Sequence, residues 1–177
     1  MNKTQRLHLR EVKLSDLSAV HQLHSFPEVD QYNTLGIPES ESVTEEILST
    51  WINNGKALPR NEYVFVIESF EEEFIGLIAL TAIRPKFKSA KIWYKLHPDH
   101  WGKGFATEAL KKIIEFGFQN LQLHRLEAGC AVDNIASYKV MEKAGMIKEG
   151  GKRKVLPIRG QWVDNYEFAI LESDPGP

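Results

Sequence analysis

The sequence is poor in cysteine, in long apolar runs and in net charge. Cys130 is the only cysteine among 177 residues, so an internal disulfide framework is excluded and a reducing compartment is favoured. No apolar run approaches the ~18 residues of a membrane-spanning helix, and the polar beginning carries no signal-peptide pattern. The formal net charge of −2 indicates neither a nucleic-acid surface nor an acidic tail. These absences predict a cytoplasmic protein without membrane or nucleic-acid partners.

Two common phosphate-binding signatures are missing as well. The sequence has no Gly-x-x-x-x-Gly-Lys-Ser/Thr motif, and its glycines come too late in the chain for a dinucleotide fingerprint. Internal repeats, low-complexity tracts and linkers are also absent. The 177 residues are 42% hydrophobic and 26% charged, which is typical of one ordinary globular domain. We therefore expect a single domain over residues 1–177.

The order of the predicted elements indicates an α+β protein with a mixed sheet. Strand patterns occur at residues 7–12, 63–67, 74–83, 90–96, 125–132, 153–158 and 162–171, and helical periodicity begins at residue 14 and returns at 42–52, 104–121 and 135–144. The strand beginning at Arg125 follows the strand ending at Leu96 through a helix, so these two should be parallel. The other neighbours should be antiparallel, with helices on both faces. We also expect Ser15 to cap the first helix, residues 25–38 to form an irregular loop and residues 172–177 to be frayed.

The unit at residues 92–110 combines a strand, a glycine turn and a helix. Gly102 and Gly104 permit positive φ angles and leave room for the backbone to approach a ligand. The first N–H groups of the following helix lack intrahelical partners and lie at the positive end of its dipole, and Lys103 adds a charge. These features favour a bound phosphate group. A glycine-rich turn without any ligand would explain the same residues, because short glycine motifs are weak signals.

Two motifs in this order resemble a known enzyme family. Trp101-Gly102-Lys103-Gly104-Phe105-Ala106 resembles the Gln/Arg-x-x-Gly-x-Gly/Ala loop of the GNAT acetyltransferase superfamily, with Trp101 in place of Gln or Arg. Asn134-Ile135-Ala136-Ser137 and Glu142-Lys143-Ala144-Gly145-Met146 are similar to the Asn-x-x-Ser…Glu-Lys-x-Gly-Phe pattern of its RimJ/RimL-like branch, which includes ribosomal-protein N-terminal acetyltransferases. The resemblance implies the GNAT fold, with one splayed parallel strand pair, and acetyl-CoA as co-substrate without a metal.

The resemblance also assigns the cofactor site. The pantetheine arm would lie between the parallel strands, and the glycine loop would hold the pyrophosphate. The residues expected to contact acetyl-CoA are Ile92, Tyr94, Leu96, Trp101, Gly102, Lys103, Gly104, Phe105, Ala106, Thr107, Asn134 and Ser137.

Ser137 is the catalytic residue that the resemblance implies, as the proton donor to the departing thiolate. Many GNAT proteins use a tyrosine four residues before the glycine of the second motif, but Met141 occupies that position here. From the residues alone, Asn134 as an N-cap and Ser137 in the first helical turn are an ordinary alternative. Tyr138 should project roughly 100° away around the helix.

The general base is not evident in the sequence. RimL-like enzymes place a glutamate on the strand after this helix, but no acid occurs between Glu149 and Asp164, and Leu156 stands at the aligned position. Glu127 and Glu28 are the remaining candidates for a base acting through water. An α-amine with a pKa of ~7.7–8.0 loses its proton at pH 7 for about 1 kcal/mol, whereas a lysine amine at ~10.4 needs about 4.6 kcal/mol. A weakly basic amine is therefore the easier acceptor.

We therefore expect an N-acetyltransferase that acts on a primary amine, either a protein N-terminal α-amine or a small molecule. A polyamine or an aminoglycoside-like drug is the small-molecule alternative, and a non-catalytic acyl-CoA sensor is the alternative from another class. A homodimer is an assembly that the sequence leaves open. His21 and His24 lie three apart on a predicted helix, but no third ligand is near, so we expect a solvated helix face rather than a metal site.

Overall fold

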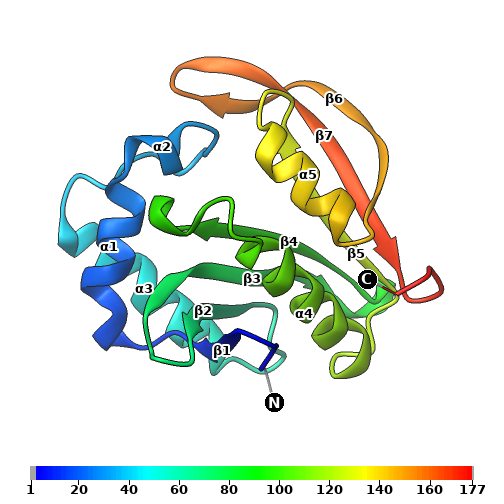
Figure 1. The fold of residues 1–177 in the computed structure, drawn as a ribbon, viewed down its shortest axis with the longest axis horizontal. Coiled ribbons are helices and arrows are strands. Elements are labelled where there is room, and N and C mark those ends of the chain that lie inside the picture. Colours follow the sequence, from blue (N-terminus) through cyan, green and yellow to red (C-terminus); the bar gives the residue numbers. More distant parts are fainter. Residues whose placement is uncertain (1–2, 177) are drawn as a thin grey trace.

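The computed structural model describes residues 3–176 and shows a seven-stranded sheet covered by helices on both faces (Figure 1). The strands are β1 (Leu7–Glu11), β2 (Tyr63–Ser69), β3 (Phe74–Arg84), β4 (Ser89–Leu96), β5 (Arg125–Ala131), β6 (Ile147–Ile158) and β7 (Gln161–Leu171). The α-helices are α1 (Leu17–Ser25), α2 (Pro27–Asp30), α3 (Glu41–Gly55), α4 (Phe105–Gln119) and α5 (Ile135–Lys143). The sheet order is β1-β2-β3-β4-β5-β7-β6. Among these strands, only β4 and β5 are parallel neighbours, so the predicted fold class is confirmed.

Alternation along the strands divides the core into two layers. Successive side chains of a strand point to opposite faces of the sheet. Phe65 of β2 therefore packs with Leu110 of α4, whereas its neighbour Val66 packs with Leu23 of α1 and Leu48 of α3. The sheet is covered by α4 and α5 on one face and by α1 and α3 on the other, as Figure 1 shows. No helix in residues 3–176 has the length and the apolar character needed to cross a membrane.

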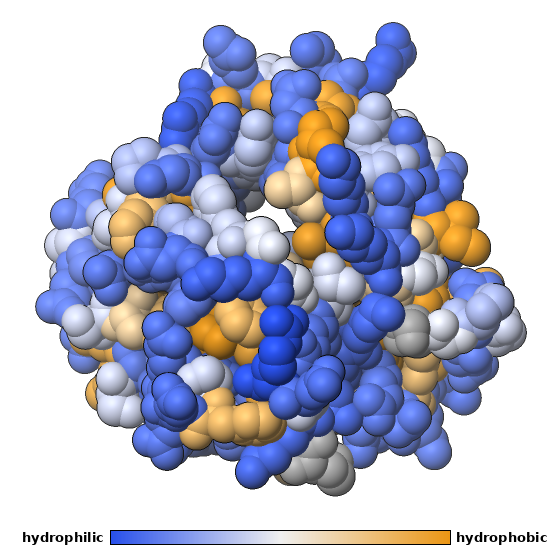
Figure 2. Space-filling model, viewed as in Figure 1, coloured by the Kyte–Doolittle hydropathy of each residue, from blue (hydrophilic) through white to orange (hydrophobic). Residues whose placement is uncertain are grey.

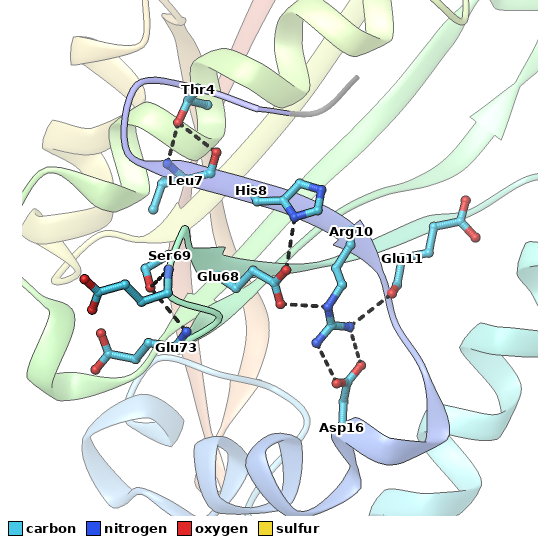
Figure 3. Close-up of polar contacts among 10 residues, drawn as sticks. Thr4, Leu7, His8, Arg10, Glu11, Asp16, Glu68, Ser69 and Glu73 are labelled. Atoms are coloured by element: carbon cyan, nitrogen blue, oxygen red, sulfur yellow. Dashed lines mark hydrogen bonds and ion pairs between the residues drawn. The ribbon is translucent and has the colours of Figure 1, made fainter.

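A charged network fixes the first strand to the first helix (Figure 3). The Arg10 guanidinium donates to Glu68 at 2.7 Å and to Asp16 at 2.8 Å. Asp16 also accepts a hydrogen bond from the backbone N–H of Lys13 at 2.8 Å. The prediction that Ser15 caps the first helix is wrong, because the Asp16 carboxylate binds this backbone N–H and a 3-10 turn over Leu14–Asp16 precedes α1. Hydrogen bonds to these two carboxylates raise the pKa of Arg10, so the guanidinium keeps its positive charge.

Two expectations about extended or irregular segments are corrected. The segment at residues 25–38 contains the short helix α2, whose Asp30 N–H donates to the Phe26 carbonyl at 3.1 Å. The strand predicted to start at residue 153 begins at Ile147. Ile147 to Val155 are exposed on this edge strand, so the apolar alternation that reveals a half-buried strand is missing.

The end of the chain is held more firmly than expected. The backbone N–H of Glu172 donates to the His124 carbonyl at 3.1 Å, and Asp174 accepts from the N–H of Leu171 at 2.9 Å. The expectation of a frayed tail is therefore wrong up to Asp174, because these bonds attach the tail to the residue before β5 and to the end of β7. Pro177 lies outside the described residues.

Candidate active site

The parallel strands β4 and β5 are paired only where they begin. Their register covers Ser89 with Arg125, Ala90 with Leu126 and Lys91 with Glu127, and no pairing follows. Beyond this point the strands splay around a cavity of about 830 Å³, and the molecule is hollowed near the middle of the view in Figure 2. The backbone of residues 92–96 on the edge facing β5 is thus available to an extended ligand, as the edge of a sheet is.

Most residues expected to contact acetyl-CoA line this cavity. They are Ile92, Tyr94, Leu96, Trp101, Gly102, Gly104, Phe105, Ala106, Thr107, Asn134 and Ser137. Lys103 is not part of the cavity wall, and its carbonyl accepts a hydrogen bond from Arg6 at 3.1 Å. The fold therefore brings three separate segments of the chain to one concave surface, and their contact with the cofactor stays a prediction.

Backbone conformation explains the two glycines of the loop. Gly102 has φ +74° and Gly104 has φ +81°, a left-handed conformation that side chains disfavour. Gly104 is also the N-cap of α4. A Cβ at Gly104 would lie 3.5 Å from the Arg6 guanidinium, an ordinary contact distance. Glycine is therefore required here for its conformation, whether or not the side-chain space is needed by a ligand.

A clamp from the N-terminal segment holds the start of α4. The Arg6 guanidinium donates to Glu108 at 2.7 Å and lies 4.6 Å from the ring centre of Phe105. Thr4 donates to the same Glu108 carboxylate at 2.5 Å. Burial alone would raise the pKa of Glu108, but the hydrogen bonds from Thr4 and Arg6 lower it. The ionised Glu108 carboxylate thus attaches the N-terminal segment to the first turn of α4, next to the glycine loop.

A second, smaller cavity adjoins the glycine loop. It has a volume of about 360 Å³ and shares Gly104 and Thr107 with the larger cavity. Glu108 and Lys111 of α4 also line it, as does Lys143 of α5, which lines the larger cavity too. Two cations beside a helix N-terminus are suited to phosphate groups. Lys143 was not predicted at this place, because it comes from a different helix.

A pair of hydroxyl groups lies in the wall of the large cavity. Tyr94 Oη and Ser137 Oγ are 2.7 Å apart. Asn134 Oδ1 accepts from the Ser137 N–H at 3.0 Å, so the interpretation of Asn134 as an N-cap is confirmed. Burial raises the pKa of Tyr94 and the hydrogen bond with Ser137 offsets this only in part, so the phenol stays protonated. Ser137 therefore lies in the first turn of α5 and also lines the cavity.

Comparison with known proteins decides the family. Residues 6–147 match the family described as acetyltransferase (GNAT) domain. The chain belongs to the GNAT acetyltransferase family.

Relatives of this GNAT acetyltransferase fall into more than one substrate group. The chain is 34% identical over 171 residues to the uncharacterized N-acetyltransferase YnaD of Bacillus subtilis (strain 168), covering 97% of this chain and 96% of the relative. It is 34% identical over 104 residues to the ribosomal-protein-serine acetyltransferase of Escherichia coli (strain K12), covering 58% of each. The crystal structure of spermidine N-acetyltransferase from Vibrio cholerae in complex with CoA and spermine has a TM-score of 0.86 at 28% identity, covering 97% of this chain and 98% of that one. The resemblance to the ribosomal-protein branch is confirmed, and acetyl-CoA is the acyl donor of this GNAT acetyltransferase.

The two carboxylates considered as bases for the GNAT acetyltransferase lie in different places. Glu28 lines the large cavity, as does Leu156 of β6. Glu127 accepts from Arg125 at 2.8 Å, lies 3.8 Å from Arg84 and is not in the cavity wall. The Glu127 side chain is thus paired near the closed end of the strand pair, whereas Glu28 lies in the cavity wall.

The histidines of α1 do not form a solvated face, contrary to expectation. His24 is 2% exposed and lies edge-on to Trp51, with ring centres 6.1 Å apart. His21 is bonded to Thr44 of α3 at 2.8 Å. The packing of α1 against α3 thus covers this face of the helix. No group of three or more metal-ligating side chains occurs within residues 3–176.

Proposed function

We propose that this acetyltransferase moves the acetyl group directly from acetyl-CoA to a weakly basic primary amine, with Ser137 assisting the departing thiolate. The observation that carries the proposal is the Tyr94–Ser137 hydroxyl pair, 2.7 Å apart in the wall of the cavity between the splayed strands. Acyl transfer from a thioester needs a neutral amine, a stabilised carbonyl oxygen and a protonated leaving group. The hydroxyl pair would serve the last of these.

The cofactor would lie along the splayed edge of β4. The pantetheine arm would pair with the backbone of residues 92–96, and the pyrophosphate would meet the N–H groups of the glycine loop at the start of α4. Lys111 and Lys143 line the adjoining cavity and would face the phosphates. Backbone amides carry most of this binding, because several of them converge on one anion.

The transfer step balances by moving one proton from nitrogen to sulfur. The amine nitrogen attacks the thioester carbonyl carbon, the carbon–sulfur bond breaks, and the amine releases a proton as the amide forms. Ser137 would donate a hydrogen bond to the sulfur, and Tyr94 would donate to Ser137 in turn. The raised pKa of Tyr94 keeps this phenol protonated as a donor. Such assistance is typically worth ~10²–10⁴-fold in rate.

A covalent route through Cys130 is disfavoured. Cys130 lines the same cavity, but burial raises the pKa of its thiol to about 11. At pH 7 roughly one thiol in 10⁴ would be ionised, and the thiolate is the nucleophile. Direct transfer within a complex of enzyme, acetyl-CoA and amine is therefore favoured.

The acceptor amine must lose its proton with little help. Glu28 is the only carboxylate among the residues that line the large cavity, and Leu156 replaces the expected glutamate. A polyamine is a second candidate acceptor, supported by the likeness to the spermidine N-acetyltransferase of Vibrio cholerae.

Release of free thiol from acetyl-CoA in the presence of an amine panel tests the proposal. We expect amine-dependent release, faster for weakly basic amines, with intersecting rather than parallel double-reciprocal lines. Parallel lines together with acetylated Cys130 would contradict direct transfer. If acetyl-CoA binds but no amine in the panel releases thiol, the protein acts as an acyl-CoA sensor and the proposal fails.

A further inference from the structure

The acceptor side of the cavity contains a lysine without a partner. Alternation along β4 places Ile92 and Tyr94 on the α4 and α5 side, where the cofactor is expected, and Trp93 on the α1 and α3 side. Lys95 follows two residues after Trp93, so it shares that second side. Lys95 lines the cavity, and its ammonium forms no ion pair or side-chain hydrogen bond within the described part of the chain. Burial lowers the pKa of Lys95 to about 8, partly opposed by Asp30, so most of it is still cationic at pH 7.

A buried histidine beside this lysine also lacks partners. His24 lines the cavity, and neither of its ring nitrogens has a hydrogen-bond partner in residues 3–176. Burial and then the charge of Lys95 lower the pKa of His24 to about 3, so the ring is neutral. A neutral imidazole offers one N–H donor and one acceptor. Buried polar groups are normally paired, so the two side chains together mark a place for a polar ligand group.

The local charges indicate the sign of that group. Glu28 is the only carboxylate in the cavity wall. Asp30 is buried; its Oδ2 lies 3.5 Å from the Arg159 guanidinium, and its Oδ1 has no hydrogen-bond partner within residues 3–176. A second ammonium of a polyamine would therefore meet the unpaired cation of Lys95 rather than a set of carboxylates. An anionic group would instead gain a charge-assisted bond from Lys95.

The size of the acceptor is limited by the hairpin of β6 and β7. In Figure 1 the turn of this hairpin lies beside α2, and Arg159 donates to the Pro27 carbonyl at 2.8 Å. This contact joins α2 to the β6–β7 hairpin across the acceptor side of the cavity. Trp51 and Trp93, with ring centres 5.5 Å apart, line the cavity and provide apolar surface. A bridge across this side of the cavity favours a small molecule over the end of a protein chain.

Resting on the proposed function, we propose that the acceptor is a small amine of the amino-acid type, whose carboxylate is bound by Lys95 and His24. Its carbon chain would lie against Trp51 and Trp93, and its amine would point toward the thioester beside Ser137. Lys95 is thus a specificity-determining residue that touches the substrate and takes no part in proton transfer.

Matched acceptors with and without a carboxylate test this assignment directly. Leucine, leucinamide and isopentylamine share a carbon chain, as do phenylalanine, phenylalaninamide and 2-phenylethylamine, and spermidine represents the polyamines. We expect kcat/KM, expressed per unprotonated amine, to be at least tenfold higher for the amino acid than for the amine that lacks the carboxylate. The amide should behave like the amine, since it carries no negative charge.

The Lys95→Met variant should lose the preference for the amino acid over the amine. We expect the ratio of its kcat/KM for leucine to its kcat/KM for isopentylamine to fall to near one, because only the amino acid carries a carboxylate for Lys95 to bind. Lys91→Met is the matched control, because Lys91 is an exposed residue on the same side of β4, outside the cavity. Calorimetric titration of leucine into CoA-saturated protein gives a second readout, independent of turnover, and should lose its signal in Lys95→Met.

The outcomes separate this inference from the proposed function. If no amine is acetylated, the proposed function itself fails. If amines are acetylated without a gain from the carboxylate, or if Lys95→Met keeps that gain, the inference is overturned. A higher kcat/KM for spermidine, or for a peptide beginning with leucine, would overturn it in favour of a polyamine or a protein N-terminus.

Discussion

His24 should make the protein sensitive to mild acid. The folded state holds the pKa of this buried imidazole at about 3, whereas an unfolded histidine titrates near 6.5. The unfolded state therefore binds the proton first, and stability is lost as the pH falls below about 6.5, with the loss growing until about pH 3. At pH 5 the difference of ~1.5 pH units corresponds to about 2 kcal/mol, at 1.36 kcal/mol per unit.

A variant isolates this contribution from the other titrating groups. His24→Met keeps an apolar side chain of similar size against Trp51 and cannot be protonated. Urea unfolding, followed by tryptophan fluorescence at pH 7 and pH 5, should show a loss of unfolding free energy about 2 kcal/mol larger in the wild type than in the variant. Melting temperatures should differ accordingly, by ~4–8 °C for a chain of this size.

Two results bear on the reasoning. Between pH 7 and pH 8 the wild type and His24→Met should show parallel stability, because the imidazole is neutral in both folded and unfolded states there. If both proteins lose the same stability between pH 7 and pH 5, then His24 is hydrated or paired in solution, and its role as a neutral ligand of the acceptor is refuted.

Three further predictions concern the cofactor side. Gly104→Ala should cost ~1–2 kcal/mol of stability, because its φ of +81° is disfavoured for other residues, and should weaken acetyl-CoA binding in calorimetry; unchanged affinity would contradict the loop assignment. Ser137→Ala should lower kcat and kcat/KM together by ~10²-fold or more with little change in acetyl-CoA affinity, whereas Tyr138→Phe should be nearly normal, and the reverse pattern would show that the proton donor is misassigned. Glu108→Gln should weaken the clamp on Arg6 by ~1–2 kcal/mol in thermal unfolding and raise the KM for acetyl-CoA, and an unchanged KM would separate the clamp from cofactor binding.

The sequence predicted the parts of the site that are formed by residues close together in the chain. The glycine turn between β4 and α4 and the Asn134 cap of α5 are set by conformational needs of neighbouring residues, so their residue types reveal them. Tyr138 could also be placed away from the cavity from helical geometry alone, and its ring packs on Phe168 with centres 5.1 Å apart. The parallel pairing of β4 and β5 followed from the intervening helix.

Contacts between segments distant in the chain could not be predicted from the sequence. Arg6 and Glu108 are 102 residues apart in the chain, and each alone resembles an ordinary surface charge. Lys95 lies near the end of β4, and the sequence did not reveal that its side of the strand faces the layer of α1 and α3. The burial of His24 depends on where α3 packs, which helical periodicity does not specify.

The crystal structure of the protein in complex with CoA is the measurement that tests the central claim most directly. We predict that the pyrophosphate accepts hydrogen bonds from backbone N–H groups of residues 102–107. The pantetheine arm should pair with the edge of β4, and the sulfur should lie within hydrogen-bond reach of Ser137 Oγ. A CoA molecule bound outside the gap between β4 and β5, or a sulfur atom remote from the Tyr94–Ser137 pair, would contradict this account.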